Sequence, residues 1–283
     1  MNTFKKLALL LPMAILGLTA CDSFQKEIDV DLPDYEGELV VECYLRPGKR
    51  MTLLLTKSLP YFGQVGLPQV RNAEVTIGSY HTYRSSITQF SYRSNAPFIP
   101  GEYFNYQSDA YVSYDPESYY LLTIKDKLTG QVITGRAEAL VQPHISEIET
   151  RFRKSDTTAF LLTKFEDIEP NKRNYYRILV KRRLEGTKDK LVNDIKFEGN
   201  LKTGNQIAIG SSYDFKDGDQ AIVTLYHISK PYYDFLRTMD GAQQGNQNPF
   251  AQPTNIKSTV EGGLGVFTFL TYDERKFRVK FEE

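Results

Sequence analysis

Residues 119–140 read YYLLTIKDKLTGQVITGRAEAL, and two runs within them are rich in apolar, aromatic and β-branched residues. The runs Tyr119–Lys125 and Val132–Leu140 have the composition of strands. Between them, Asp126–Gly130 supplies the polar residues and the glycine that turns prefer. The stretch therefore predicts a β-hairpin.

The residues before this hairpin indicate the kind of sheet that it joins. Asp115 and Pro116 precede the tyrosine pair, so Tyr119 or Tyr120 stands where immunoglobulin-like sandwiches often carry a corner tyrosine. Arg46-Pro47-Gly48 reads as a turn between two earlier strands. The earlier strand-like segments are Leu39–Leu45, Met51–Thr56, Ala73–Tyr80 and Thr88–Tyr92.

We expect residues 38–142 to form an immunoglobulin-like β-sandwich, because this many short strands in about a hundred residues is typical of that fold. The whole chain has 19 Tyr and 17 Phe, which favour strands, but no Trp. Since it also lacks a cysteine pair within this region, a true antibody-type domain is excluded.

Residues 143–283 are expected to form a second β-rich domain, after a linker that begins at Pro143 and His144. One helix should start at Ser229, Lys230 and Pro231 and end near Gly241. The predicted fold class is therefore mostly β, with a sandwich followed by a β-rich domain that contains one short helix. The strands expected in the second domain are Ala159–Phe165, Tyr175–Lys181, Asp194–Glu198, Gln206–Ile209, Ala221–Ile228, Val266–Tyr272 and Phe277–Phe281.

The first 20 residues have the layout of a secretory signal peptide. Lys5 and Lys6 precede an uncharged apolar run, Leu7–Leu18, and small residues follow it. A dozen apolar residues interrupted by Pro12 fall short of the roughly 20 that cross a bilayer as a helix. We therefore expect residues 1–20 to be removed.

Cys21 is the expected site of lipid attachment. Leu18-Thr19-Ala20-Cys21 resembles a bacterial lipobox, in which the cysteine thiol accepts a diacylglyceryl group before the signal is cut. Each buried CH₂ contributes about 0.8 kcal/mol, and two or more acyl chains anchor a protein stably. The chain is thus expected to be held on a membrane by lipid.

Residues 21–37 are expected to be an acidic tether that holds the body away from the membrane. Acidic residues after a lipidated cysteine resemble the surface-export signals of Bacteroidota lipoproteins. We therefore expect an outer-membrane location, facing outward.

Charge and cysteine content exclude other roles. Removing Lys5 and Lys6 turns 35 basic and 35 acidic residues into 33 and 35, a formal charge of about −2, which gives no case for nucleic acid. Cys43 remains as the single thiol after lipidation and is expected to be a small buried hydrophobe.

No motif in the sequence predicts catalysis, a metal or a cofactor. The three histidines, His81, His144 and His227, are scattered without metal-ligand spacing. The glycines of 261–265 lead into a strand, which indicates a tight bend or close backbone packing and not a phosphate loop.

Four tyrosines are the candidate binding residues. Tyr103, Tyr106, Tyr111 and Tyr114 lie in a segment with weak strand character, and loops between strands often carry binding sites. Tyrosines packed along a sandwich edge are the structural alternative.

Several motifs in a fixed order resemble the Bacteroidota lipoproteins known as the domain of unknown function 4249 family. Together they span almost the whole mature chain. They are Glu27–Tyr35 leading into Leu39–Glu42, then Leu59–Phe62, Asn72–Val75, the helix with Tyr232, Tyr233, Phe235 and Leu236, Asn248–Phe250, Pro253, Asn255 and Glu261–Val266.

The resemblance implies an outer-membrane lipoprotein whose gene often neighbours a TonB-dependent transporter, and it supplies no catalytic residues. A non-enzymatic accessory or binding subunit of such a β-barrel transporter is the leading hypothesis. A structural or assembly lipoprotein of the cell envelope is the alternative, and a glycan or peptide hydrolase is a third.

Overall fold

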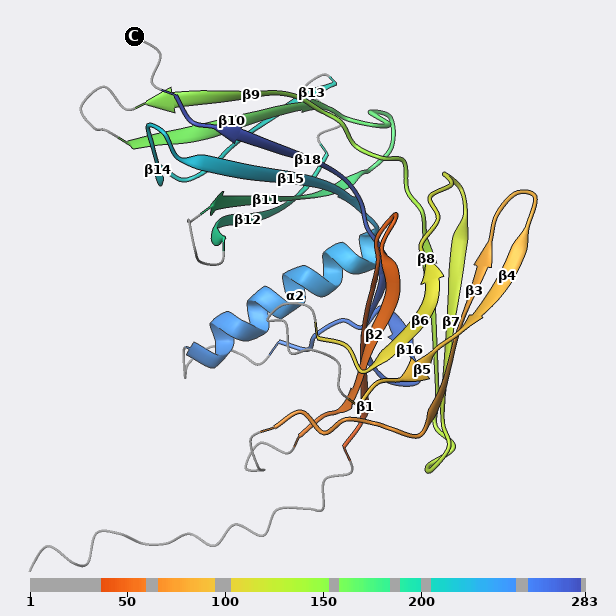
Figure 1. Ribbon diagram of the computed structural model, residues 1–283. Helices are drawn as coiled ribbons and strands as arrows, with labels where there is room; N and C mark the ends of the chain where they lie inside the picture. Colours follow the sequence, from red (N-terminus) through yellow and green to blue (C-terminus); the bar gives the residue numbers. More distant parts are fainter. Residues whose placement is uncertain are drawn as a thin grey trace, which may run out of the picture. The chain divides into compact units, whose positions relative to one another are not determined.

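Two five-stranded sheets pack face to face in the N-terminal half of the protein (Figure 1). The computed structural model describes residues 37–59, 66–94, 103–152, 158–183, 189–199, 205–247 and 254–280, so the expected signal peptide, Cys21 and most of the expected tether lie outside the described residues. The first sheet has the order β17-β1-β2-β6-β5, with β1 at Leu39–Leu45, β2 at Arg50–Lys57, β5 at Ser91–Tyr92, β6 at Tyr106–Tyr111 and β17 at Leu264–Phe269. The second has the order β16-β8-β7-β3-β4, with β3 at Ala73–Tyr80, β4 at Ser85–Gln89, β7 at Tyr119–Asp126, β8 at Val132–Glu138 and β16 at Val260–Glu261.

Alternating burial along the strands produces this sandwich. In β1, Leu39, Val41, Cys43 and Leu45 are fully buried, while the residues between them face outward. The opposite sheet contributes Tyr120, Leu122 and Ile124 of β7 to the same hydrophobic core. The predicted β-sandwich is thus confirmed.

Tyr120 is the corner tyrosine. Its ring is fully buried, and its hydroxyl donates a 2.7 Å hydrogen bond to the carbonyl of Ser113, seven residues upstream. Tyr119 points to the other face, where its ring stacks on Tyr80 at 4.9 Å. The predicted hairpin is also present, with Gly130 at φ +76° and the Asp126 carboxylate accepting from Thr129 at 2.8 Å.

The sandwich is completed by strands from near the C-terminus. β17 pairs in parallel with β1, with Val41 opposite Gly265 and Leu45 opposite Phe269, and β16 pairs with β8. These strands cross the boundary expected at residue 142, because the free edges of β1 and β8 are filled by residues from the far end of the chain. Gly37–Glu283 accordingly pack as one unit.

Glycine is required where β17 meets β1. Gly265 has φ +118°, and a side chain there would collide with the carbonyl oxygen of Val41. Gly262 has φ +77°, and a side chain there would strike the carbonyl oxygen of Val132. The close-packing interpretation of this glycine run is confirmed.

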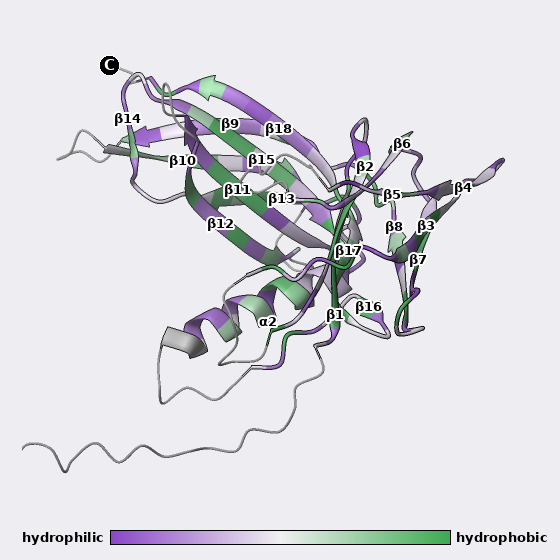
Figure 2. Cartoon of the chain, turned by 60° about the horizontal axis from the view of Figure 1, so that its bottom comes forward, coloured by the Kyte–Doolittle hydropathy of each residue, from purple (hydrophilic) through white to green (hydrophobic). Residues whose placement is uncertain are grey.

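Two further sheets make up the C-terminal region and enclose a core of their own, with Phe165, Tyr176 and Phe215 among its buried rings. One sheet has the order β12-β11-β15-β18, with β11 at Tyr175–Arg183, β12 at Lys190–Glu198, β15 at Gln220–Ile228 and β18 at Thr271–Arg278. The other has the order β13-β10-β14 with β9 paired to β10, where β9 is Ile145–Phe152, β10 Thr158–Glu166, β13 Gln206–Gly210 and β14 Phe215–Lys216. In Figure 2, hydrophobic and hydrophilic bands alternate along strands such as β12 and β15 and along α2.

Three sequence predictions in this region were wrong. Ile145–Phe152 is a strand where a linker was expected, and its polar, mostly half-buried residues explain the weak signal. The helix α2 spans Lys230–Gln247 and continues through Gly241. Gly241 does not have a positive φ, so it does not terminate the helix. The run expected as one strand, Val266–Tyr272, divides at Leu270 between two sheets.

Helix α2 packs between the two regions. Ser229 begins it, with its hydroxyl oxygen 3.4 Å from the amide nitrogen of Tyr232. The apolar side of α2 buries Tyr232 and Leu236 against Ile228 of the C-terminal sheet and Val266 of β17. The single described helix therefore joins both halves through one hydrophobic cluster.

We expect Gly265→Ala to lower the free energy of unfolding by about 3 kcal/mol, because it adds both backbone strain and a collision inside the sandwich. Gly66→Ala is the matched control, since open space surrounds Gly66, and its effect should stay within about 0.5 kcal/mol. Urea unfolding of both variants measures the difference. Equal midpoints would contradict the parallel pairing.

His227 makes the stability of the fold depend on pH. Its ring is buried, stacks on Tyr176 at 5.4 Å and lies with Nδ1 2.9 Å from the carbonyl of Val141, and burial lowers its pKa. As the pH falls below about 6.5, the unfolded chain takes up this proton before the folded chain does, so stability is lost. We expect His227→Asn to lose less stability than the wild type between pH 7.5 and pH 5.5 in thermal unfolding. Identical losses would show that His227 does not contribute.

Candidate functional site

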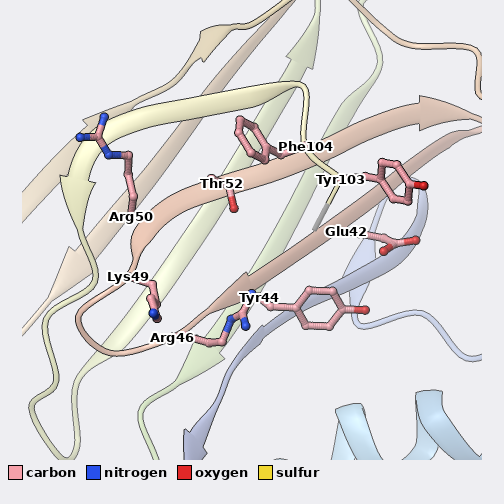
Figure 3. A pocket seen from close by; sticks show the side chains of 8 residues that line it. All are labelled: Glu42, Tyr44, Arg46, Lys49, Arg50, Thr52, Tyr103 and Phe104. Atoms are coloured by element: carbon pink, nitrogen blue, oxygen red, sulfur yellow. The ribbon is translucent and has the colours of Figure 1, made fainter. Parts of the chain in front are cut away.

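A cavity of about 320 Å³ lies on the outer face of β1 and β2 (Figure 3). Because the odd-numbered residues of β1 enter the core, Glu42 and Tyr44 point outward, and Thr52 lies on the neighbouring strand. The cavity is lined by Glu42, Tyr44, Arg46, Lys49, Arg50, Thr52, Tyr103 and Phe104. We refer to these eight residues as the β1–β2 pocket.

The turn between β1 and β2 places the cations of the pocket. Gly48 has φ +70°, and its amide donates to the carbonyl of Val112 at 2.9 Å. Lys49 donates its amide to the carbonyl of Arg46 at 3.0 Å and accepts from the amide of Val112 at 2.8 Å. These bonds fix the backbone on both sides of the turn from which Arg46, Lys49 and Arg50 line the pocket, with Arg46 beside Tyr44 and Arg50 on the far side of Lys49.

The cations differ in how far they are already neutralised. Arg50 lies 3.1 Å from Asp109 Oδ1, and its guanidinium sits 5.4 Å from the ring centre of Tyr111. The Asp109 side chain is 88 % exposed, so water screens this pair. Among the residues that the structure describes, Lys49 Nζ forms no ion pair, and it remains available to a ligand.

The other end of the pocket is formed by Glu42 and Tyr44. Burial raises the pKa of the Glu42 carboxyl and, more strongly, the pKa of the Tyr44 phenol. The Tyr44 ring meets the ring of Tyr232 edge to face at 6.2 Å, so helix α2 supports this wall. The phenol stays protonated and can donate a hydrogen bond.

A charged network holds α2 behind Tyr44. Arg177 donates 2.8 Å and 2.7 Å hydrogen bonds to the two carboxylate oxygens of Asp194 and a third, at 2.9 Å, to the hydroxyl of Tyr232. Lys196 bridges Asp194 and Asp240 at 3.2 Å and 2.8 Å. The Arg177 guanidinium therefore holds Tyr232, and the Tyr232 ring in turn fixes the position of Tyr44 in the unliganded protein.

The family model described as Domain of unknown function (DUF4249) matches residues 25–276. The chain belongs to this family. The match extends over both β regions and α2, which confirms the resemblance expected from the ordered motifs. A comparison with curated proteins gives no significant match.

The four candidate tyrosines of this DUF4249 protein do not form one surface. Tyr103 lines the β1–β2 pocket and Tyr111 lies under Arg50, whereas Tyr106 is 1 % exposed and its oxygen accepts from the amide of Ala73 at 3.0 Å. Tyr114 packs near the linker, where its hydroxyl accepts from the amide of Gln142 at 3.0 Å. Tyr106 and Tyr114 therefore act in packing.

Most residues of the pocket were missed by sequence reasoning. Glu42 and Tyr44 alternate with apolar residues in β1, and the cations flank a Pro-Gly turn, which is also the pattern of an ordinary solvated hairpin. Cys43 between them is fully buried, and burial raises the pKa of its thiol, so its prediction as a small hydrophobe is confirmed.

In one cluster of the DUF4249 protein, a serine, a histidine and an aspartate lie next to one another as they do in a hydrolytic triad. Ser113 Oγ lies 3.3 Å from His81 Nε2, and His81 Nδ1 lies 3.5 Å from Asp115 Oδ2. The Nδ1 atom nevertheless makes no hydrogen bond in the structure, and the imidazole is 5 % exposed. Without that bond the base is not oriented as catalysis requires, and its ring packs edge to face on Tyr120 at 5.9 Å.

We expect a fluorophosphonate probe to leave Ser113 unlabelled, because His81 is buried and lacks its orienting bond. Intact-protein mass spectrometry of the wild type and of Ser113→Ala measures the labelling. A stoichiometric adduct on the wild type that disappears in Ser113→Ala would contradict this expectation and favour a hydrolase.

Proposed function

We propose that this DUF4249 protein is a lipid-anchored, non-enzymatic accessory subunit of the outer membrane that binds a ligand or partner beside a TonB-dependent transporter. The observation that carries the proposal is the N-terminal pattern: Lys5 and Lys6, an apolar run, and Leu18-Thr19-Ala20-Cys21. A thiol at this position accepts lipid, and two or more acyl chains anchor a protein stably on a bilayer.

The body that follows the anchor suits binding. Its pocket is lined by one carboxylate, three cations and three aromatic rings, which is the mixture of polar and apolar groups that ligand sites use. Within the described residues, no helix has the length and apolar character needed to cross a membrane.

The acidic segment after Cys21 supports display on the outward face, because such segments resemble the surface-export signals of Bacteroidota lipoproteins. Its acidic residues are Glu27, Asp29, Asp31, Asp34 and Glu36.

The length of the tether supports a partner in the membrane. A chain of residues 21–37 reaches at most about 60 Å when fully extended. An anchored body on such a tether stays close to neighbouring membrane proteins, which raises its effective concentration for a partner there.

We expect the lipidated, affinity-tagged full chain to co-purify with a β-barrel transporter from detergent-solubilised membranes. Mass spectrometry identifies the captured proteins, and incorporation of labelled palmitate reports the lipid. Cys21→Ala is the matched control, because it removes the lipid acceptor and leaves the body unchanged. It should take up no label.

Capture of no β-barrel protein would contradict the accessory role. If depletion of the protein also changed the content of several membrane proteins, a structural or assembly lipoprotein would replace it. Uptake of labelled palmitate by Cys21→Ala would contradict lipid attachment at Cys21.

A further inference from the structure

The β1–β2 pocket is electrostatically polarised. Figure 3 shows Arg50 and Lys49 on one side and Glu42 with Tyr103 on the other, with Thr52 and Phe104 between them. The lining has three cations and one carboxylate, and Asp109 pairs with Arg50 beside it, so a smaller excess of positive charge remains around the cavity.

Several features of the cationic end favour a bound anion over an internal ion pair. Arg50 has one carboxylate neighbour, Asp109, which points into solvent, and Lys49 has no ion pair among the described residues. Guanidinium and ammonium groups that converge on a partly enclosed cavity bind carboxylate or phosphate through charge-assisted hydrogen bonds. Enclosure strengthens these bonds relative to those on an open surface.

The other end of the pocket selects for hydrogen-bonding groups. Glu42 offers carboxylate oxygens as acceptors, and the Tyr44 phenol and Thr52 hydroxyl can donate or accept. The rings of Tyr103 and Phe104 provide flat apolar surface at the rim. A cavity of about 320 Å³ is of the size that small-molecule sites have.

We propose that the β1–β2 pocket binds a small anionic ligand: a carboxylate or phosphate group held by Arg46, Lys49 and Arg50, on a hydroxylated ring that hydrogen-bonds to Glu42. The inference rests on the proposed binding role of the protein and names the chemistry of its ligand. Carboxylate and phosphate share this recognition, and matched probes separate them.

Titration calorimetry of the lipidated mature chain in a non-ionic detergent tests the proposal. The probes are glucose 6-phosphate, glucuronate and glucose, which share a ring and differ in the anionic group. We expect at least one anion to bind about tenfold more tightly than glucose, with an affinity that falls as salt is raised. Tighter binding of glucose 6-phosphate identifies phosphate as the natural group, and tighter binding of glucuronate identifies carboxylate.

Two matched variants locate the binding. Lys49→Gln removes one positive charge from the pocket and should weaken the anion about tenfold. Lys125→Gln removes the same charge from β7 in the opposite sheet and should leave the affinity unchanged. Glu42→Gln should tighten binding of the anion, because it removes the one negative charge of the lining.

Equal binding of glucose and both anions, no binding of any probe, or equal effects of Lys49→Gln and Lys125→Gln would overturn the proposal. These results are distinct from failure of the accessory role, which is read from the proteins captured with the full chain. A protein that captures a β-barrel and ignores anions refutes the ligand chemistry alone.

Discussion

The parallel pairing of β1 with β17 is the constraint on which the rest of the structure depends. It closes the first sheet of the sandwich, and its backbone approaches so closely that only glycine fits at 265. Leu270 follows directly, with its amide donating to the carbonyl of Leu45 at 2.8 Å, and the chain then enters β18 of the other region. One strand therefore fixes both the edge of the sandwich and the starting point of the C-terminal sheet.

The same pairing positions the pocket. Val266 of β17 belongs to the hydrophobic cluster under α2, and Tyr44 of β1 packs on that cluster from the pocket side. The Arg177–Asp194 ion pair behind Tyr44 is mostly buried. The desolvation of the two charges therefore offsets much of their attraction. We infer that the pair contributes more to the orientation of α2 and of the Tyr44 wall than to net stability.

Local patterns in the sequence predict the local parts of this fold. The β7–β8 hairpin, the corner role of Tyr120 and the burial of Cys43 each depend on a few neighbouring residues, and each is present. The positions of β16 and β17 could not be predicted in this way. The residues of a strand do not indicate with which distant strand it will pair. The polar edge strand β9 lacks the apolar alternation by which strands are found.

The pocket escaped prediction for the same physical reason. Arg46, Lys49 and Arg50 look like ordinary solvated residues around a turn, and Tyr103 and Phe104, which complete the pocket, come from another segment of the chain. The structure separates the candidate tyrosines, since Tyr103 lines the cavity while Tyr106 belongs to the core. Composition marks aromatic residues, but it does not tell a buried ring from a binding ring.

The contribution of β17 to the first sheet also bears on how the protein is made. During synthesis, β1 emerges early and carries a row of unpaired backbone groups beside a strongly apolar face until the last part of the chain arrives. Chains that end prematurely would retain this open edge, which is a template for aggregation. The first sheet is therefore complete only when the last part of the chain is present, and C-terminal truncation acts on this sheet as directly as a mutation within it.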